Sequence, residues 1–151
     1  RARLVKRPRY RAEAGTGEKT MAVILVIDDN ADFKGVIFDY LIMMGHKVLN
    51  ADNGREGVEK ALKAKPDLIL LDVMMPDMGG FEALKELRAE EETKNIPVFI
   101  ITGSAFDVKM GELFMQEPNC REFLDKTISL ALLNKKIEAA LENRPGPPKR
   151  T

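Results

Sequence analysis

Two hydrophobic periods alternate along the chain, and this alternation constrains the fold more than any other feature of the sequence. Short continuous runs of apolar and β-branched residues are typical of parallel strands that are buried on both faces. Between these runs, apolar residues recur every three or four positions, which predicts helices with one buried face. The runs predict strands at residues 22–27, 46–51, 68–71, 97–101 and 121–124.

The first helical segment shows the spacing most clearly. Asn30 or Asp32 can cap its start, and His46 beyond its end is expected at the surface. The last two helices are expected over residues 104–116 and 128–141. The apolar residues expected on the buried face of the first helix are Phe33, Val36, Ile37, Tyr40, Leu41 and Met44.

Strands that alternate with helices imply parallel pairing, because each crossover helix must bury its apolar stripe against the sheet. The strand order 2-1-3-4-5 is a common solution for a sheet of this size. We therefore predict an α/β fold: a flavodoxin-like, doubly wound parallel sheet of five strands with five helices. In such sheets the ligand site lies beyond the carboxyl ends of the strands, beside the switch in strand order.

The formal net charge of zero hides a strong segregation of charge. Residues 1–20 carry seven basic and two acidic groups, whereas residues 21–142 carry 14 basic and 22 acidic groups. We expect residues 1–20 to be a disordered basic leader, either vector-derived or read from an upstream start, and residues 143–151 to be a disordered proline-rich tail. The acidic body, expected to be a single domain, argues against a nucleic-acid surface on it.

Cysteine content and hydropathy exclude two further classes of protein. The single thiol, Cys120, cannot form an internal disulfide, so a secreted disulfide scaffold is excluded. The longest apolar run is much shorter than the ~20 residues that a membrane span needs. We therefore expect a cytoplasmic protein that does not bind a membrane.

Four of the five predicted strands end in residues of complementary chemistry. Asp28 and Asp29 follow the first strand, Asp72 follows the third, Thr102 follows the fourth and Lys126 follows the fifth. In the predicted strand order these ends meet at one edge of the sheet. Three carboxylates held this close repel one another, and burial increases the cost. A cation must offset that charge, and Mg²⁺, for which Mn²⁺ could substitute, prefers such oxygen ligands.

A carboxylate beside a divalent cation can attack phosphorus and form an acyl phosphate. Lys126 and the cation would neutralise charge on the transferred group, and Thr102 could donate a hydrogen bond to it. Taken singly, each aspartate is better explained as a helix cap, Lys126 as a solvated lysine and Thr102 as a turn or cap residue. The coincidence of all of them at neighbouring strand ends favours the phosphoryl chemistry.

Four sequence fragments in order resemble a known family, the receiver domain of two-component response regulators, and in particular its stand-alone type typified by the chemotaxis regulator. The resemblance covers residues 22–142. The successive spacings between Asp29, Asp72, Thr102 and Lys126 are 43, 30 and 24 residues, within the usual range of the family. The four fragments read ILVIDD at 24–29, LLDVMMPDMGG at 70–80, IIT at 100–102 and FLDK at 123–126.

The resemblance implies a role for each acidic residue. Asp72 would be the phosphorylated aspartate. Asp29 would bind Mg²⁺ directly, Asp28 mostly through water, and the backbone carbonyl of Met74 would complete the ligands supplied by the protein. The domain would catalyse only its own phosphorylation and dephosphorylation, so it is not expected to be an enzyme in any other sense.

The resemblance also implies a switch and its partners. Thr102 and Lys126 would hold the phosphoryl oxygens, and movement of Thr102 would let Phe123 turn inward. That movement would reshape the surface formed by residues 104–116, the strand at 121–124 and the last helix. A histidine kinase or phosphotransfer protein would donate the phosphoryl group, and an unknown protein target would bind the changed surface. The protein is expected to be a monomer or a phosphorylation-dependent dimer.

The sequence departs from the family pattern near the lysine. The family usually has a proline after it, with a cis peptide bond, whereas Thr127 follows Lys126 here. Because a cis bond without proline costs ~3 kcal/mol, we expect a trans bond and a shifted loop. Met74 and Ser104 should flank the path of the hydrolytic water. Methionine cannot orient that water, so we predict a phosphoryl lifetime of minutes or more.

Other functions remain as alternatives. The domain could be a fragment of a larger regulator or hybrid kinase, or an unphosphorylated binding module of receiver-like fold. A phosphohydrolase with an aspartyl nucleophile usually needs a second aspartate two residues later, where this chain has Met74. A flavin-binding protein of the same fold is disfavoured because no serine- or threonine-rich phosphate loop follows the first strand.

Overall fold

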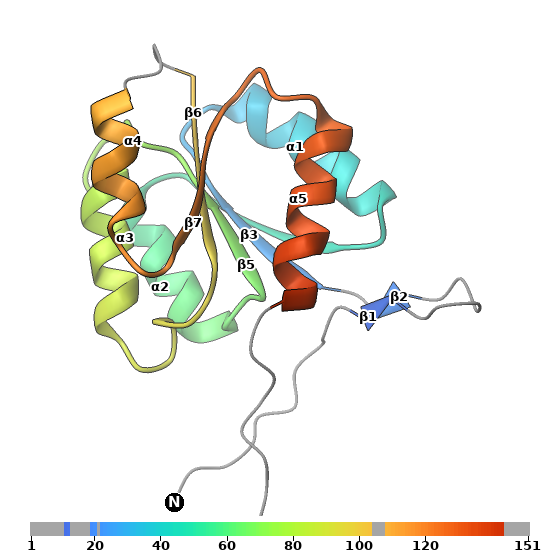
Figure 1. Cartoon of the computed structure of the whole chain (residues 1–151), viewed down its shortest axis with the longest axis horizontal. Helices are drawn as coiled ribbons and strands as arrows, with labels where there is room; N and C mark the ends of the chain where they lie inside the picture. The colour runs from blue at the N-terminus through green and yellow to red at the C-terminus, as the bar shows by residue number, and fades with distance from the viewer. Residues whose placement is uncertain (1–10, 13–18, 21, 104–107, 144–151) are drawn as a thin grey trace, which may run out of the picture.

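The computed structural model describes residues 11–12, 19–20, 22–103 and 108–143. Its body is a five-stranded parallel sheet between two layers of helices (Figure 1). The spatial order of the strands is β4-β3-β5-β6-β7, which confirms the predicted order 2-1-3-4-5. The strands are β3 (Val23–Ile27), β4 (Lys47–Ala51), β5 (Leu68–Leu71), β6 (Val98–Thr102) and β7 (Cys120–Asp125).

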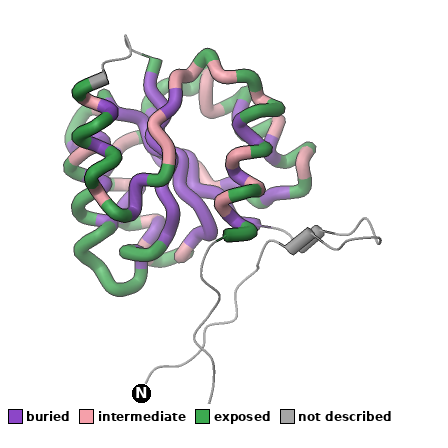
Figure 2. Tube along the Cα trace, in the orientation of Figure 1, coloured by how far each residue is buried: buried purple, intermediate pink, exposed green. Residues whose placement is uncertain are grey.

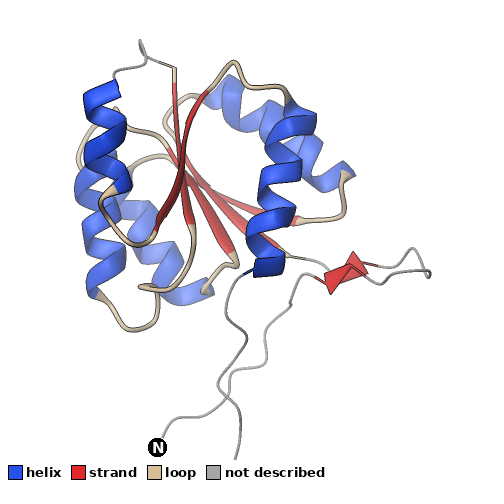
Figure 3. Cartoon of the chain, in the orientation of Figure 1, coloured by secondary structure: helices blue, strands red, loops and turns tan. Residues whose placement is uncertain are grey.

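Five helices connect or follow these strands and cover both faces of the sheet (Figure 3). Helices α1 and α5 pack on one face, and α2, α3 and α4 pack on the other (Figures 1 and 3). The boundaries lie within a few residues of the prediction. The helices are α1 (Ala31–Met43), α2 (Gly54–Ala64), α3 (Gly80–Ala89), α4 (Val108–Met115) and α5 (Leu130–Asn143).

Burial on both faces explains the continuous apolar runs. Alternate residues of β3 enter opposite cores: Leu25 packs with α2 and α3, whereas Ile24 packs with α1 and α5. Every residue of β3, β5 and β6 is buried, and the strands form the buried centre of the molecule in Figure 2. The positions within these three strands must therefore be apolar. Polar residues first occur where each strand ends, at the rim of the sheet.

Helix α1 follows its predicted capping but only part of its predicted face. The side chain of Asn30 accepts a hydrogen bond from the Phe33 N–H at 2.9 Å. Ile37 and Leu41 are buried as predicted, but the prediction for Val36 is wrong, because this side chain is 54% exposed. The sheet and α5 cover only a narrow stripe of α1.

His46 is also placed differently from the prediction. It is buried rather than at the surface, and its Nε2 lies 3.3 Å from Oδ1 of Asn134 on α5. Helix α1 ends at Met43, and Gly45, whose φ is 96°, turns the chain before His46. This turn directs the chain under α5, where the amide of Asn134 offers a polar partner.

The described parts of the terminal segments are short. Arg11–Ala12 (β1) pairs antiparallel with Lys19–Thr20 (β2), whereas no strand was predicted in this region. The disordered leader is otherwise untested and stays a prediction, as does the proline-rich tail, since residues 144–151 lie outside the described residues. Among the described helices, none combines the length and apolar character needed to cross a membrane.

Candidate functional site

The polar strand ends predicted from the sequence meet at one rim of the sheet. Backbone hydrogen bonds continue the parallel ladder one residue beyond the strands. The N–H of Asp28 donates to the carbonyl of Ala51 at 3.0 Å, and that of Asp72 donates to the carbonyl of Ile27 at 2.9 Å. The N–H of Lys126 donates to the carbonyl of Thr102 at 2.9 Å. The sheet itself therefore fixes the backbone positions of the acidic and basic residues.

Three carboxylates form a compact cluster at this rim. Asp28, Asp29 and Asp72 each offer one oxygen, and these oxygens lie within 4.8 Å of one another. Asp28 and Asp72 are buried and Asp29 is exposed. Burial, and then the neighbouring charge of Asp28, raises the pKa of Asp72 to about 6. The cluster thus concentrates negative charge at a rim where, of the three carboxylate residues, only Asp29 is exposed.

Lys126 supplies the positive charge inside the cluster. Its Nζ lies 2.7 Å from Oδ2 of Asp28 and 3.8 Å from Oδ1 of Asp72. The same ammonium lies 4.6 Å from the ring centroid of Phe33, at the start of α1. The sequence interpretation missed this contact, since it assigned Phe33 only to the buried face of α1. No local signal could have found it, because Phe33 and Lys126 are far apart in the chain.

Close backbone packing holds the loop after Asp72. A Cβ on Gly80 would lie 2.3 Å from the Asp72 carbonyl oxygen, so only glycine fits there. The Gly80 N–H donates to the carbonyl of Val73 at 2.8 Å. On the other side of the cluster, Oδ1 of Asp28 accepts a hydrogen bond from the Asn30 N–H at 2.8 Å. These contacts restrict where the two buried carboxylates can point.

The remaining predicted residues lie around the cluster at different depths. Thr102 is buried at the end of β6. The ring of Phe123 on β7 is half-buried, with its centroid 5.4 Å from that of Phe114 on α4. Met74 is 68% exposed, and Ser104 lies outside the described residues.

The loop after Lys126 forms without the proline of the family pattern. The described residues contain no cis peptide bond, so the expected trans bond between Lys126 and Thr127 is confirmed. The N–H and the hydroxyl of Thr127 both donate to Oδ1 of Asp125, each at 2.8 Å. Asp125 therefore fixes the turn that follows β7.

Comparison with known proteins identifies the family. The sequence profile of the response regulator receiver domain matches residues 24–138. The chain belongs to this family of receiver domains. PilH of Pseudomonas aeruginosa is similar to this receiver domain, with 36% identity over 121 residues that cover 80% of this chain and 98% of PilH. The polar-differentiation response regulator DivK of Brucella anthropi is 29% identical over 78% of this chain and 94% of its own length.

Solved structures agree with the fold of this receiver domain. The chemotaxis response regulator CheY4 of Vibrio cholerae is 30% identical with a TM-score of 0.73, covering 80% of this chain and 98% of CheY4. The receiver domain of a sensor histidine kinase from Pseudomonas aeruginosa is 26% identical with a TM-score of 0.74, covering 82% and 99%. That domain was solved with a magnesium ion coordinated in its active-site cleft. The family is one of two-component signalling proteins.

Proposed function

We propose that this receiver domain accepts a phosphoryl group on Asp72 in a two-component phosphorelay and uses it to switch protein–protein binding. The observation that carries the proposal is the cluster itself. Three carboxylate oxygens lie within 4.8 Å of one another, and the ammonium of Lys126 reaches two of the three carboxylates. If the three aspartates served only as helix caps, their like charges would not need to lie together at a partly buried rim.

The groups at this rim can accept the phosphoryl group and stabilise its oxygens. An oxygen of Asp72 attacks the phosphorus of a phosphohistidine on a kinase or phosphotransfer protein. The phosphorus–nitrogen bond breaks, and the imidazole nitrogen keeps the electron pair and takes up a proton. Thr102 donates a hydrogen bond to one phosphoryl oxygen, while Lys126 leaves its contact with Asp28 to pair with another.

The donor set at the rim fits a hard divalent cation. We expect Asp29 and Asp72 to bind Mg²⁺ directly, Asp28 mostly through water, and the backbone carbonyl of Met74 to complete the set, with Mn²⁺ as a substitute. When bound, the cation neutralises charge on the transferred group. Burial and the charge of Asp28 raise the pKa of Asp72, and a cation beside the cluster would oppose this shift and favour the ionised, nucleophilic carboxylate.

The phosphorylated site would communicate with partners through α4, β7 and α5. Thr102 ends β6 and Phe123 lies on the adjacent strand. A shift of Thr102 toward the phosphoryl group would open space for Phe123, which now packs against Phe114 of α4. The proposed partners are a histidine kinase or phosphotransfer protein and an unknown protein target. A cytoplasmic location, and a monomer or phosphorylation-dependent dimer, remain part of this proposal.

Intact-mass analysis after incubation with Mg²⁺ and acetyl phosphate tests the acceptor chemistry. One phosphoryl adduct of ~80 Da is expected on the unchanged protein. Asp72→Asn should show no adduct, and Asp77→Asn, which changes an exposed aspartate of the same loop, should still show it. If the unchanged protein acquires no adduct, the alternative of an unphosphorylated binding module is favoured.

A further inference from the structure

Helix α4 has a glycine, Gly111, in the middle of its eight residues. Alanine in place of glycine inside a helix usually raises the folding equilibrium constant about two- to fivefold. Gly111 is buried, and a Cβ added to it would lie 3.3 Å from Cδ2 and 3.6 Å from Cε2 of Phe123. The first of these distances is shorter than ordinary van der Waals contact between carbons. The space above Gly111, here called the α4 notch, therefore accommodates the ring only because the side chain is missing.

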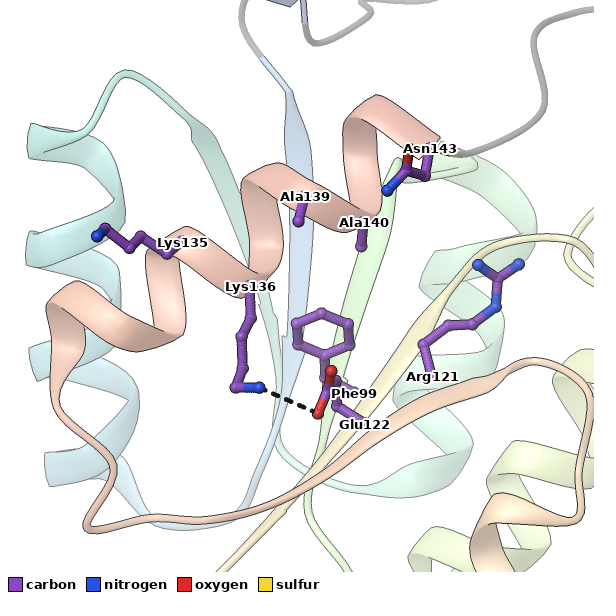
Figure 4. Close-up of a pocket in the computed structure, with 8 residues that line it drawn as sticks. All are labelled: Phe99, Arg121, Glu122, Lys135, Lys136, Ala139, Ala140 and Asn143. Atoms are coloured by element: carbon purple, nitrogen blue, oxygen red, sulfur yellow. Dashed lines mark ion pairs between the residues drawn. The ribbon is translucent and has the colours of Figure 1, made fainter.

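The alternation of side chains along β7 directs Phe123 toward this notch. Figure 4 shows the preceding residue, Glu122, facing α5, where its Oε1 lies 3.5 Å from Nζ of Lys136. Neighbouring side chains of a strand point to opposite faces of the sheet. Phe123 accordingly packs against the core on the side of α2, α3 and α4. The strand itself thus places the ring against α4.

A second aromatic ring limits how this contact can relax. Phe114 lies three residues after Gly111, on the same face of α4, and its ring centroid is 5.4 Å from that of Phe123. Phe114 also meets Phe81 of α3 edge-on, with centroids 5.1 Å apart and an interplanar angle of 85°. Because Phe114 is 3% exposed and packed on α3, it has little room to yield. A methyl group on Gly111 would therefore displace Phe123.

The displaced ring would have to turn about its side-chain torsions, since pairing with β6 fixes its backbone. Phe123 pairs with Ile100, and Asp125 pairs with Thr102. Thr102 thus lies two positions further along, on the same face of the sheet as Phe123. It is also buried. The ring leaves the α4 notch most easily when Thr102 moves, which is the movement that the proposed function assigns to the phosphorylated state.

We propose that Gly111 is a positioning residue: the α4 notch seats the ring of Phe123 in the resting receiver domain and so sets how readily the switch leaves that state. The proposal rests on the proposed function and adds a residue that belongs to neither the carboxylate cluster nor its cation. Filling the notch would destabilise the resting position of the ring. A larger share of the molecules would then be ready to accept the phosphoryl group.

A double-mutant cycle in urea unfolding tests the contact. Phe123→Val removes the ring but keeps a residue that favours strands. In that background, Gly111→Ala should raise the folding equilibrium constant about two- to fivefold. With the ring present, the same substitution should give no gain or a loss, a coupling of about fivefold. Gly35→Ala is the matched control: Gly35 lies inside α1 with nothing within 4 Å of its Cβ, and its effect should be equal in both backgrounds.

Fluorine NMR of the full chain, with 4-fluorophenylalanine in place of Phe123, reports where the ring lies. Mg²⁺ with beryllofluoride, a mimic of a phosphoryl group on a carboxylate, should move the resonance. Gly111→Ala alone should move it part of the way in the same direction. The same variant should accelerate labelling by acetyl phosphate about threefold in a mass time course, as expected for a shifted population. Gly35→Ala should do neither.

Two results would overturn the proposal: an equal effect of Gly111→Ala with and without the ring, or a fluorine resonance that Gly111→Ala leaves in place. Failure of the proposed function would look different. If the cycle shows coupling and Gly111→Ala moves the resonance, but the unchanged protein acquires no ~80 Da adduct, only the phosphoacceptor role is rejected. An adduct without coupling in the cycle would reject only the positioning role of Gly111.

Discussion

Replacing Asp72 with asparagine should stabilise the protein at neutral and alkaline pH in metal-free buffer. In the folded protein, burial and the charge of Asp28 raise the pKa of Asp72 from 3.8 to about 6. The folded state therefore binds this proton more tightly than the unfolded chain does. The resulting stability is present below the unfolded pKa and is lost as the pH rises through the folded pKa. Asparagine removes that loss because it does not ionise.

The size of the effect follows from the two pKa values. A difference between 3.8 and about 6 corresponds to ~3 kcal/mol at pH 8. Water reaches the rim beside the exposed Asp29, which screens the charges and reduces the expected gain to about 1–2 kcal/mol. For a domain of this size, that gain corresponds to a rise in Tm of roughly 4–8 °C.

Chemical unfolding of both proteins with a chelator present measures this difference. The stability gain of Asp72→Asn should be present at pH 8 and should shrink strongly at pH values near 4. Asp39→Asn, which alters an exposed aspartate of α1 away from the cluster, provides the matched control and should show a much smaller dependence on pH. A difference between Asp72→Asn and the unchanged protein that is the same at both pH values would refute the electrostatic reasoning.

Three further predictions concern residues around the rim. Gly80→Ala should destabilise the protein by about 2 kcal/mol in urea unfolding, because the new Cβ would lie 2.3 Å from the Asp72 carbonyl oxygen. Gly35→Ala, with nothing within 4 Å of its Cβ, should not destabilise it. Phe33→Leu removes the ring beside Lys126, a contact of about 0.5–1 kcal/mol, and should slow phosphorylation by acetyl phosphate several-fold in a mass time course, while Phe33→Tyr should not. The acyl phosphate should last for minutes or more, since the exposed Met74 cannot orient water; a half-life of a few seconds with Mg²⁺ would contradict this.

The sheet and the convergence of its polar ends could be predicted from sequence for one physical reason. A strand buried on both faces must be apolar at every position, so the first polar residue marks the rim. Strand order then brings Asp28, Asp72 and Thr102 to neighbouring positions. The backbone hydrogen bonds from Asp72 to Ile27 and from Lys126 to Thr102 express this constraint directly.

Contacts between distant helices could not be predicted in the same way. The spacing of apolar residues in α1 includes Val36, but it does not say how wide a stripe the sheet and α5 cover. His46 is buried because Asn134 of α5 lies beside it, 88 residues further along the chain. A polar partner at that sequence separation leaves no local pattern, so a histidine after a glycine turn is predicted at the surface.

The turn after Lys126 shows how a departure from the family pattern can preserve a site. A proline restricts its backbone through its ring, and it has neither an N–H nor a hydroxyl to donate. Thr127 has both, and Oδ1 of Asp125 accepts both at 2.8 Å. These hydrogen bonds hold the pKa of Asp125 below its usual value. Two directed hydrogen bonds thus restrain the loop in place of a ring. Because the restraint acts on the residues on either side of Lys126, its ammonium can still lie 2.7 Å from Asp28.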